Sequence, residues 1–391
     1  MALKKTLLSA AELEEIRKRA SRAIAPLRPA TKLFGHGKRT SAGRTLPPYY
    51  LVYFLLVELL GFRYSGREEK VDWIIPVEFE GHFFTVEFRK LGLGIFSTES
   101  SKEGAFARLV AKAIHKGVNA ATPFFNHLAA KAVQSSQLNV TNNSLWLFDR
   151  YKFLRDQFKE KAASAEARKD EVIKTELPRE APGIVGFLYI HPSHELMNQA
   201  EWLAIGAIDA FFSWTEHIFI HIGILTGKLT TAENVAALAV AKWEEKAKVA
   251  LDLSDDATRK RYEEILEIRR QVRNYIAHGS FGKQGEAFQF HSSAGAVPVM
   301  LNEPATGGFS ILEHVSFKEI DAISTIERFV EHLWSDPLAP AKLYIEDAVL
   351  PAILTYASDG TYARAMQSTE EMGEFVYHLS HQIDDAANMD W

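Results

Sequence analysis

The sequence predicts a mainly α-helical protein: a C-terminal helical bundle with a small β-hairpin, following an N-terminal α+β domain that has a β-hairpin of its own. Three observations predict it. Apolar residues recur at helical spacing over long segments after residue 191. Apolar and charged residues alternate across a glycine turn within residues 73–96. A cluster of proline and glycine at residues 177–183 marks the boundary between the two parts.

Composition limits the function classes. A chain of 391 residues is long enough for two or three domains. The net charge of -5 gives no general argument for nucleic-acid binding, so RNA would have to contact local basic patches. The absence of cysteine excludes disulfides, thiolate catalysis and cysteine-based zinc sites, and it fits the cytoplasmic location that we expect.

No membrane association is expected. The N-terminus leads into an amphipathic helix rather than the apolar core of a secretory signal. The most apolar run, residues 49–62, is short for a membrane span and contains Glu58, so we predict a buried core helix there.

Residues 1–47 are predicted to form a basic arm. Ser9 and Glu12 have the spacing of a capping box, which predicts a helix to Arg22, followed by an exposed loop to Arg44. Basic residues predominate over the whole segment: Lys4, Lys5, Arg17, Lys18, Arg19, Arg22, Arg28, Lys32, Lys38, Arg39 and Arg44. The arm is either an electrostatic contact for RNA or a solvated surface that aids solubility.

Residues 48–182 are predicted to form the α+β domain. Pro47 and Pro48 suit the start of the apolar helix. Two strands follow on either side of a Gly81-His82 turn, with a possible third strand after them. The predicted elements in order are strands 73–80, 83–89 and 91–96, helices over 101–135 with a break at Thr122-Pro123, and a long charged helix over 146–174.

The predicted hairpin offers a rival site. Asp72, Glu87 and Arg89 or Lys90 faintly resemble the acidic-plus-lysine pattern of metal-dependent nucleases. The pattern departs from that class in two ways, because Asp72 precedes the first strand and arginine stands where lysine is expected. Charged residues on the solvent side of an ordinary hairpin would have the same alternation.

Residues 183–335 are predicted to form the helical bundle. A capping residue precedes each of two helices: Thr230 or Thr231 for one, and residues 254–256 for the next. The elements in order are strand 184–190, helices 195–225, 232–251 and 257–278, strands 287–291 and 309–315 as a pair, and helix 317–334. Residues 336–391 are predicted to be an acidic, partly helical tail.

Two carboxylates interrupt the apolar helix over 195–225. Asp209 and Glu216 are seven residues apart, which places them two turns apart on one face. A carboxylate on a mostly buried helix needs a cationic or hydrogen-bonding partner. Each therefore either helps a functional group of the bundle or forms a structural ion pair with an arginine.

A set of polar residues ends the helix over 257–278. Asn274 and His278 are four residues apart and share one helix face. Arg273 is five residues before His278, so the two converge only if the last turn tightens or the arginine folds over. Gly279 is suited to ending the helix. An arginine that can grip phosphate and a histidine that can transfer protons together predict metal-free phosphate chemistry.

The sequence Arg273-Asn274-x-x-x-His278 resembles the R-x4-6-H motif of HEPN domains, over residues 192–334. This resemblance implies a helical bundle that forms a homodimer with two motifs facing each other, and no metal or cofactor. Many such domains are metal-independent endoribonucleases that act as toxins or antiviral defence effectors, whereas others are inactive interaction scaffolds. If the motif is only structural, Asn274 and His278 cap the end of the helix and Arg273 pairs with Glu216 inside a core.

For the enzyme, we expect His278 to be the acid/base, Arg273 to clamp the phosphate and Asn274 to orient these groups. Glu216 or Asp209 would position the arginine or the histidine. The substrate would be RNA, and the product would end in a 2′,3′-cyclic phosphate.

Overall fold

The computed structural model describes residues 7–30, 37–97, 103–176, 186–278, 289–293, 295–298, 300–301, 309–310 and 319–389. For residues 273–278, only the backbone is described. The chain is mainly helical, and its strands form small antiparallel sheets, as predicted at this level. It divides into two compact units, residues 1–138 with 374–391, and residues 139–373.

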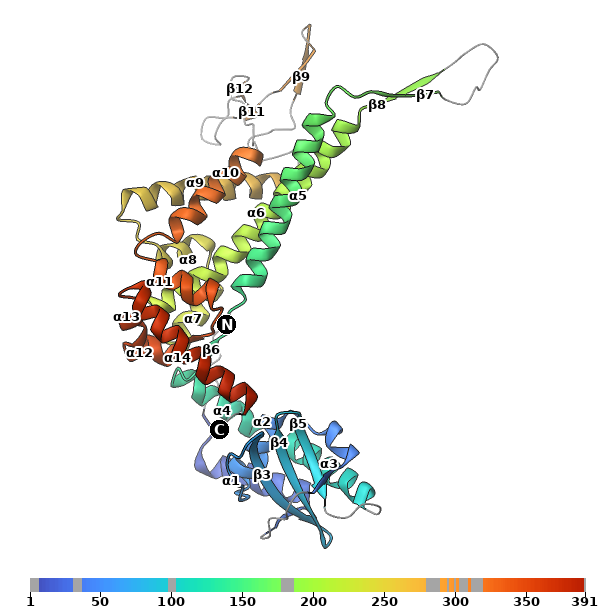
Figure 1. The fold of residues 1–391 in the computed structure, drawn as a ribbon, viewed down its shortest axis with the longest axis vertical. Helices are drawn as coiled ribbons and strands as arrows, with labels where there is room; N and C mark the ends of the chain where they lie inside the picture. The colour runs from blue at the N-terminus through green and yellow to red at the C-terminus, as the bar shows by residue number, and fades with distance from the viewer. Residues whose placement is uncertain are drawn as a thin grey trace. The chain divides into compact units, whose positions relative to one another are not determined.

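The first unit contains a five-stranded antiparallel sheet in the order β1-β3-β4-β5-β2, and Figure 1 labels β3, β4 and β5. Its central strands are β3 (Val71–Phe79), β4 (His82–Arg89) and β5 (Gly92–Ser97). This confirms the predicted hairpin and its third strand. The first turn falls at Glu80 and Gly81, one residue earlier than predicted, and both have the positive φ that a tight two-residue hairpin turn requires.

Helices bury the apolar face of this sheet. They are α1 (Ala10–Ile24), α2 (Tyr49–Tyr53) with the π-helical continuation Phe54–Leu59, α3 (Glu103–Ala120) and α4 (Thr122–Gln134). Ile75, Val86, Leu55 and Ile114 are fully buried in this core. The predicted core helix over residues 49–62 and the break at Thr122 are therefore confirmed.

Over residues 7–30 and 37–47, which the structure describes, the predicted helix is present, but the exposed loop predicted after it is wrong, because that segment packs into the first unit. Helix α1 begins with the predicted capping box of Ser9 and Glu12, but it buries an aliphatic stripe that includes Ala20 in the core. The segment after it supplies both edge strands of the sheet, β1 (Arg28–Pro29) against β3 and β2 (Lys38–Arg39) against β5. A short 3-10 helix, Ser41–Thr45, follows. The number of basic residues did not indicate this packing, because those that the structure describes are exposed, on elements whose other side is buried.

The second unit is built on two long antiparallel helices, α5 (Ser144–Ala167) and α6 (Pro192–Leu225), which lie side by side (Figure 1). The ring of Phe148 in α5 lies 4.6 Å from that of Trp214 in α6, measured between centroids. The predicted domain boundary at residue 183 therefore falls inside this unit, because α5 packs on α6 rather than on the sheet of the first unit. The unit begins at Asn139.

Shorter helices pack on this pair. They are α7 (Ala232–Ala239), α8 (Trp243–Ala250), α9 (Asp256–His278) and α10 (Glu319–Leu333). The helix predicted over 232–251 is thus two helices. Thr231 caps α7 with its side chain, and the Asp255 carboxylate caps α9 by accepting a hydrogen bond from the Thr258 amide at 2.8 Å.

The strands between α9 and α10 pair differently from the prediction. Strand β9 (Gln289–Ser292) pairs with β10 (Gly295–Pro298), and β11 (Met300–Leu301) pairs with β12 (Phe309–Ser310). Each strand pairs with a near neighbour in sequence, where a short connection suffices. Residues 287–288 and 311–315 of the predicted pair lie outside the described residues.

The predicted acidic tail is also folded. After α10, the second unit continues with α11 (Ala339–Lys342), the π-helical turn Leu343–Asp347, β13 (Ala352–Ile353) paired with β6 (Asn139–Val140), α12 (Leu354–Ser358) and α13 (Thr361–Ala365). Tyr344 and Tyr362 are buried there, with their hydroxyl oxygens 2.9 Å apart. The last helix, α14 (Thr369–Asn388), ends in the first unit, where the Met389 carbonyl accepts a hydrogen bond from the Lys70 amide.

Among the described residues, α6 is the one helix whose length and composition would allow it to cross a membrane, with a mean hydropathy of 1.3 over its most apolar window. Of that window, 56% is buried within the protein.

Candidate functional site

The predicted motif lies at the end of α9. This helix forms because Tyr262, Ile265, Ile268 and Val272 recur at helical spacing and are buried on one side. The helix continues to His278, so the backbone of Arg273, Asn274 and His278 is helical. Their side chains, and all of Gly279, lie outside the described residues. The structure does describe the side chains around Arg269, one helical turn before Arg273.

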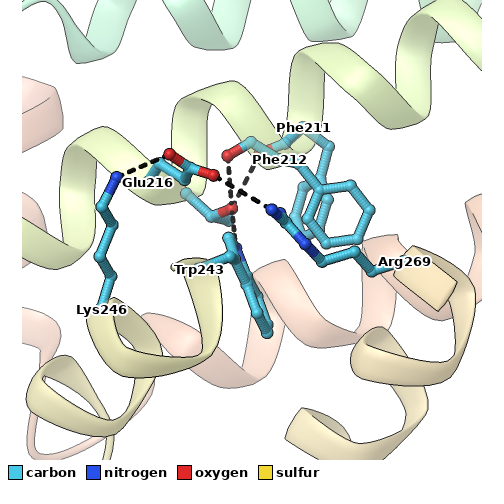
Figure 2. A network of polar contacts seen from close by, with 7 residues as sticks. Phe211, Phe212, Glu216, Trp243, Lys246 and Arg269 are labelled. Atoms are coloured by element: carbon cyan, nitrogen blue, oxygen red, sulfur yellow. Dashed lines mark hydrogen bonds and ion pairs between the residues drawn. The ribbon is translucent and has the colours of Figure 1, made fainter. Parts of the chain in front are cut away.

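Glu216 of α6 is at the centre of those surroundings. Its Oε2 accepts a hydrogen bond from Nζ of Lys246 in α8 at 2.7 Å, and its Oε1 accepts one from Nη2 of Arg269 in α9 at 3.4 Å. Figure 2 shows the carboxylate between the two cations. One carboxylate therefore joins α8 and α9 to α6. Of the two alternatives for Glu216, the structural ion pair with an arginine is present, and the arginine is Arg269.

Aromatic rings hold the Arg269 guanidinium in place. Its central carbon lies 5.1 Å from the ring centroid of Phe212 and 5.6 Å from that of Trp243, within cation–π range. The indole of Trp243 donates a hydrogen bond at 2.9 Å to the Thr215 hydroxyl, beside Glu216 on α6 (Figure 2). We call Thr215, Glu216, Trp243, Lys246 and Arg269 the Glu216 network. Its contacts fix the turn of α9 that directly precedes Arg273.

The burial of Lys246 makes this network sensitive to the loss of its acceptor. The Lys246 side chain is only 5% exposed, whereas the side chain of Glu216 is 35% exposed. A buried ammonium needs a charged or hydrogen-bonding partner. Sequence reasoning missed Lys246, although one signal was available: it stands at i+3 from Trp243 within the apolar stripe of α8 that continues to Ala247 and Ala250.

Asp209 does not belong to the network. It lies on an exposed position of α6, two turns before Glu216. Within the described part of the chain it has no ion-pair partner. The two carboxylates that share a helix face in the sequence therefore have different surroundings, since α8 and α9 supply cations to Glu216 and Asp209 is exposed.

Two further histidines of α6 escaped the sequence analysis. His217 and His221 are one turn apart, with ring centroids 4.5 Å apart. Burial lowers the pKa of His217 to about 4, and its Nε2 accepts a hydrogen bond from the Asn143 amide at 2.9 Å. Burial, and then the proximity of His217, lower the pKa of His221 to about 3. Both imidazoles are therefore neutral in the folded protein at neutral pH.

The carboxyl of Glu346 is shifted in the opposite sense. Burial raises its pKa to about 7, although the indole of Trp214 donates a hydrogen bond to it at 3.1 Å, which lowers the pKa. Glu346 follows α11, in the π-helical turn Leu343–Asp347. Near neutral pH this carboxyl therefore exists in both protonation states.

These shifts predict that acid destabilises the second unit. Unfolding returns the pKa of both histidines to about 6.5, so below pH 6.5 the unfolded state binds more protons than the folded state. The free energy of unfolding therefore decreases as the pH falls, by about 1.4 kcal/mol per pH unit for each histidine. Glu346 opposes this between pH 7 and its unfolded value near 4.5, because its folded state binds more protons. Between pH 6.5 and 4.5, where all three groups contribute, the net loss is therefore about 1.4 kcal/mol for each pH unit by which the pH falls.

Urea denaturation at pH 7.5, 6 and 5 measures this slope. The variant His217→Gln keeps an acceptor for the Asn143 amide and removes one titrating group, so its stability should depend less on pH than that of the wild type. An unchanged slope in this variant would show that His217 does not titrate as described.

The rival residues of the hairpin have separate partners. Glu87 is only 3% exposed and accepts hydrogen bonds from Thr85 Oγ1 at 2.5 Å and from Arg89 Nε at 2.6 Å. Asp72 pairs with Arg67 at 3.4 Å, and Lys90 Nζ donates to Oδ1 of Asn388 at 3.0 Å. Among the residues that the structure describes, no group of three or more histidines and carboxylates is arranged to hold a metal ion.

Comparisons of the chain with models of protein families, with curated proteins and with solved structures find no match.

Proposed function

We propose that this chain is a metal-independent endoribonuclease of the HEPN type, acting as a toxin or antiviral defence effector. The observation that carries the proposal is the position of the Arg-Asn-x-x-x-His sequence. It occupies the last turns of α9, directly after a turn that the Glu216 network holds against α6 and α8. A catalytic group on a helix that packing and hydrogen bonds fix in place can be aligned to a substrate without further ordering.

The residue types suit the cleavage of RNA at its ribose. The reaction deprotonates the 2′-hydroxyl, stabilises a pentacoordinate phosphate and protonates the leaving 5′-oxygen. In the proposed site, His278 transfers the protons, because an imidazole titrates near neutral pH. Arg273 binds the phosphate oxygens with its planar fork of donors. Asn274 orients the imidazole or donates to the phosphate, and the second histidine comes from a second subunit.

The contacts of Glu216 refine its proposed role. Its carboxylate already accepts from Lys246 and Arg269, so we assign it to positioning α9 rather than to contact with RNA. Arg269 is one turn before Arg273, and any change in the network would move the motif with the helix. Asp209, which is exposed and outside the network, has no role in this proposal.

An inactive interaction scaffold of HEPN type is the second candidate. The observation that favours it is an exposed apolar β-ribbon in the same unit, which suits binding to another polypeptide. The two candidates differ in one measurable property, the cleavage of RNA by the purified protein.

The test is to incubate the purified full-length protein with total RNA in the presence of EDTA. The proposed enzyme cleaves under these conditions and leaves fragments that end in a 2′,3′-cyclic phosphate. A phosphatase that acts on cyclic phosphates should remove this group, and its removal identifies the product. Cleavage only after addition of Mg²⁺ or Mn²⁺ would overturn the proposal. Binding of RNA without cleavage, with or without metal, would favour the scaffold.

A further inference from the structure

A two-stranded ribbon connects α5 to α6. Strand β7 (Ile173–Glu176) pairs antiparallel with β8 (Phe187–Ile190), and Figure 1 shows the ribbon beyond the end of the two helices. All eight residues are exposed, and five of them are large and apolar: Ile173, Phe187, Leu188, Tyr189 and Ile190. An isolated two-stranded ribbon is marginally stable in water, so such a composition indicates a surface that another element covers.

The two faces of the ribbon differ. Side chains alternate along a strand, and the register places Ile173 opposite Ile190 and Thr175 opposite Leu188 on one face. We call these four residues the aliphatic face. On the other face the Lys174 ammonium lies 3.7 Å from the centroid of the Phe187 ring, so that face has contacts of its own. Ile173, Leu188 and Ile190 are each more than 40% exposed.

The outer edge of β7 is the second open feature. Among the described residues, β7 and β8 pair only with each other. An edge strand presents a row of backbone donors and acceptors to which another strand can pair. Natural proteins usually protect such an edge, so an apolar ribbon with an open edge is suited to strand addition.

The sequence of β7 identifies the strand that fits. Its residues are Ile173, Lys174, Thr175 and Glu176. When this strand is laid antiparallel to its own copy about Thr175, Lys174 lies opposite Glu176 of the partner subunit, and the reverse pair forms on the other side of the axis. Opposite charges and threonine pairs are both favourable directly across two strands. The β8 sequence, which has no charge, offers no such complementarity.

We propose that β7 pairs antiparallel with β7 of a second copy of this chain, on a two-fold axis at Thr175. The result is a four-stranded sheet in the order β8-β7-β7-β8, in which the two aliphatic faces join into one apolar surface. A two-fold axis requires a patch that is complementary to itself, and β7 meets this requirement in charge as well as in hydrogen bonding. This interface goes beyond the proposed ribonuclease activity, and it is a separate contact between copies from the facing motifs that the proposed activity requires.

A charge exchange tests the pairing in the full-length protein by sedimentation velocity. Wild type is expected to dimerise. Lys174→Glu or Glu176→Lys alone places like charges opposite each other twice per dimer, which should raise the dissociation constant at least about tenfold. The double variant Lys174→Glu/Glu176→Lys restores opposite charges and should return the dissociation constant to within about threefold of wild type.

Lys169→Glu is the matched control. Lys169 lies just before the ribbon and pairs with Glu166 of its own chain, and its side chain is 60% exposed. This variant changes the net charge by the same amount as Lys174→Glu and should leave the dimer intact. Circular dichroism of each variant shows whether its fold is intact. Recovery of the dimer dissociation constant in the double variant then distinguishes loss of the interface from loss of the fold.

A single cysteine tests the axis. Because the chain has no cysteine, Thr175→Cys introduces one thiol. Directly opposed residues of antiparallel strands have Cα atoms ~4.5–5.5 Å apart, within the range of a disulfide. Mild oxidation should therefore link two chains of this variant. Tyr189→Cys, which lies on the outer strand of the proposed sheet, should give no link.

Three results would overturn the proposal. The first is a wild-type chain that stays monomeric at micromolar concentrations. The second is a dimer that is insensitive to both single charge changes, or one that the double variant fails to restore. The third is a Lys174→Glu variant that dimerises like the wild type but binds labelled single-stranded RNA or anionic lipid vesicles more weakly. This result would assign the ribbon to one of those ligands.

Discussion

The variant His278→Ala is expected to cleave RNA ~10²–10⁴-fold more slowly than wild type, because it removes the group proposed to transfer protons to and from the ribose and the leaving oxygen. The measurement is the initial rate on a defined single-stranded RNA in EDTA. The fold should persist, since the residue lies in the last turn of α9, beyond the turn that Arg269 ties to Glu216, and circular dichroism of the variant checks this. Degradation that continues at the wild-type rate in a His278→Ala preparation would refute the assignment and indicate a contaminating nuclease.

Arg273→Ala should lose activity to a similar extent, because the pentacoordinate phosphate would lack its charged donor. A matched control exists on the same helix. The side chain of Arg270 is 73% exposed and pairs with Glu267 one turn away. Arg270→Ala therefore removes the same charge from α9 without touching the proposed site, and it should cleave RNA at close to the wild-type rate. Equal losses in both variants would indicate a general electrostatic effect rather than a clamp at Arg273.

The second large effect is expected on stability. Glu216→Ala leaves the buried Lys246 ammonium without its carboxylate, and breaking a buried pair in this way typically costs ~3–5 kcal/mol. Because Glu216 is itself one-third exposed, we expect the lower end, about 3 kcal/mol, in the unfolding free energy of the second unit. Urea denaturation followed by the far-ultraviolet circular dichroism signal measures it. Asp209→Ala, on the exposed position of the same helix, should change stability by less than about 0.5 kcal/mol.

A double variant shows whether the loss comes from the stranded cation. Lys246→Met replaces the buried ammonium with an apolar side chain of similar length. Combined with Glu216→Ala, it removes both charges, so the double variant should be more stable than Glu216→Ala alone. A double variant that is less stable than Glu216→Ala would indicate that the lysine stem, rather than its charge, carries the effect.

The hairpin of the first unit could be predicted because its signals are local. The alternation in residues 73–89 and the glycine at position 81 determine strand, turn and register within a few residues. The capping box of α1 and the apolar stripe of α9 are equally local. Such signals require no knowledge of what packs against them.

The division of the chain into units could not be predicted in the same way. Helix α5 joins the second unit because Phe148 and Tyr151 pack on α6, whose residues follow some sixty positions later. Residues 1–47 were misjudged for the same reason: their density of lysine and arginine is a local property, whereas the pairing of β1 with β3 and of β2 with β5 is not.

The candidate site was predicted in part. The expectation that Glu216 needs a cationic partner follows from burying a carboxylate, and the partner on α9 is Arg269. Whether Arg269 or Arg273 pairs with Glu216 depends on how far α9 is displaced along its axis relative to α6. The periodicity within one helix does not predict this displacement. Lys246 was missed because a lysine on an apolar stripe is usually interpreted as a side chain that extends to the surface.

The hydrogen bond between Trp214 and Glu346 gives this protein an optical reporter of its own. The indole is buried, and the carboxyl that it contacts changes charge close to the pH of a cell. Trp214 is one of seven tryptophans, so its response is the pH-dependent part of the fluorescence that a Glu346→Gln variant removes, and that part should follow the ionisation of this single internal group.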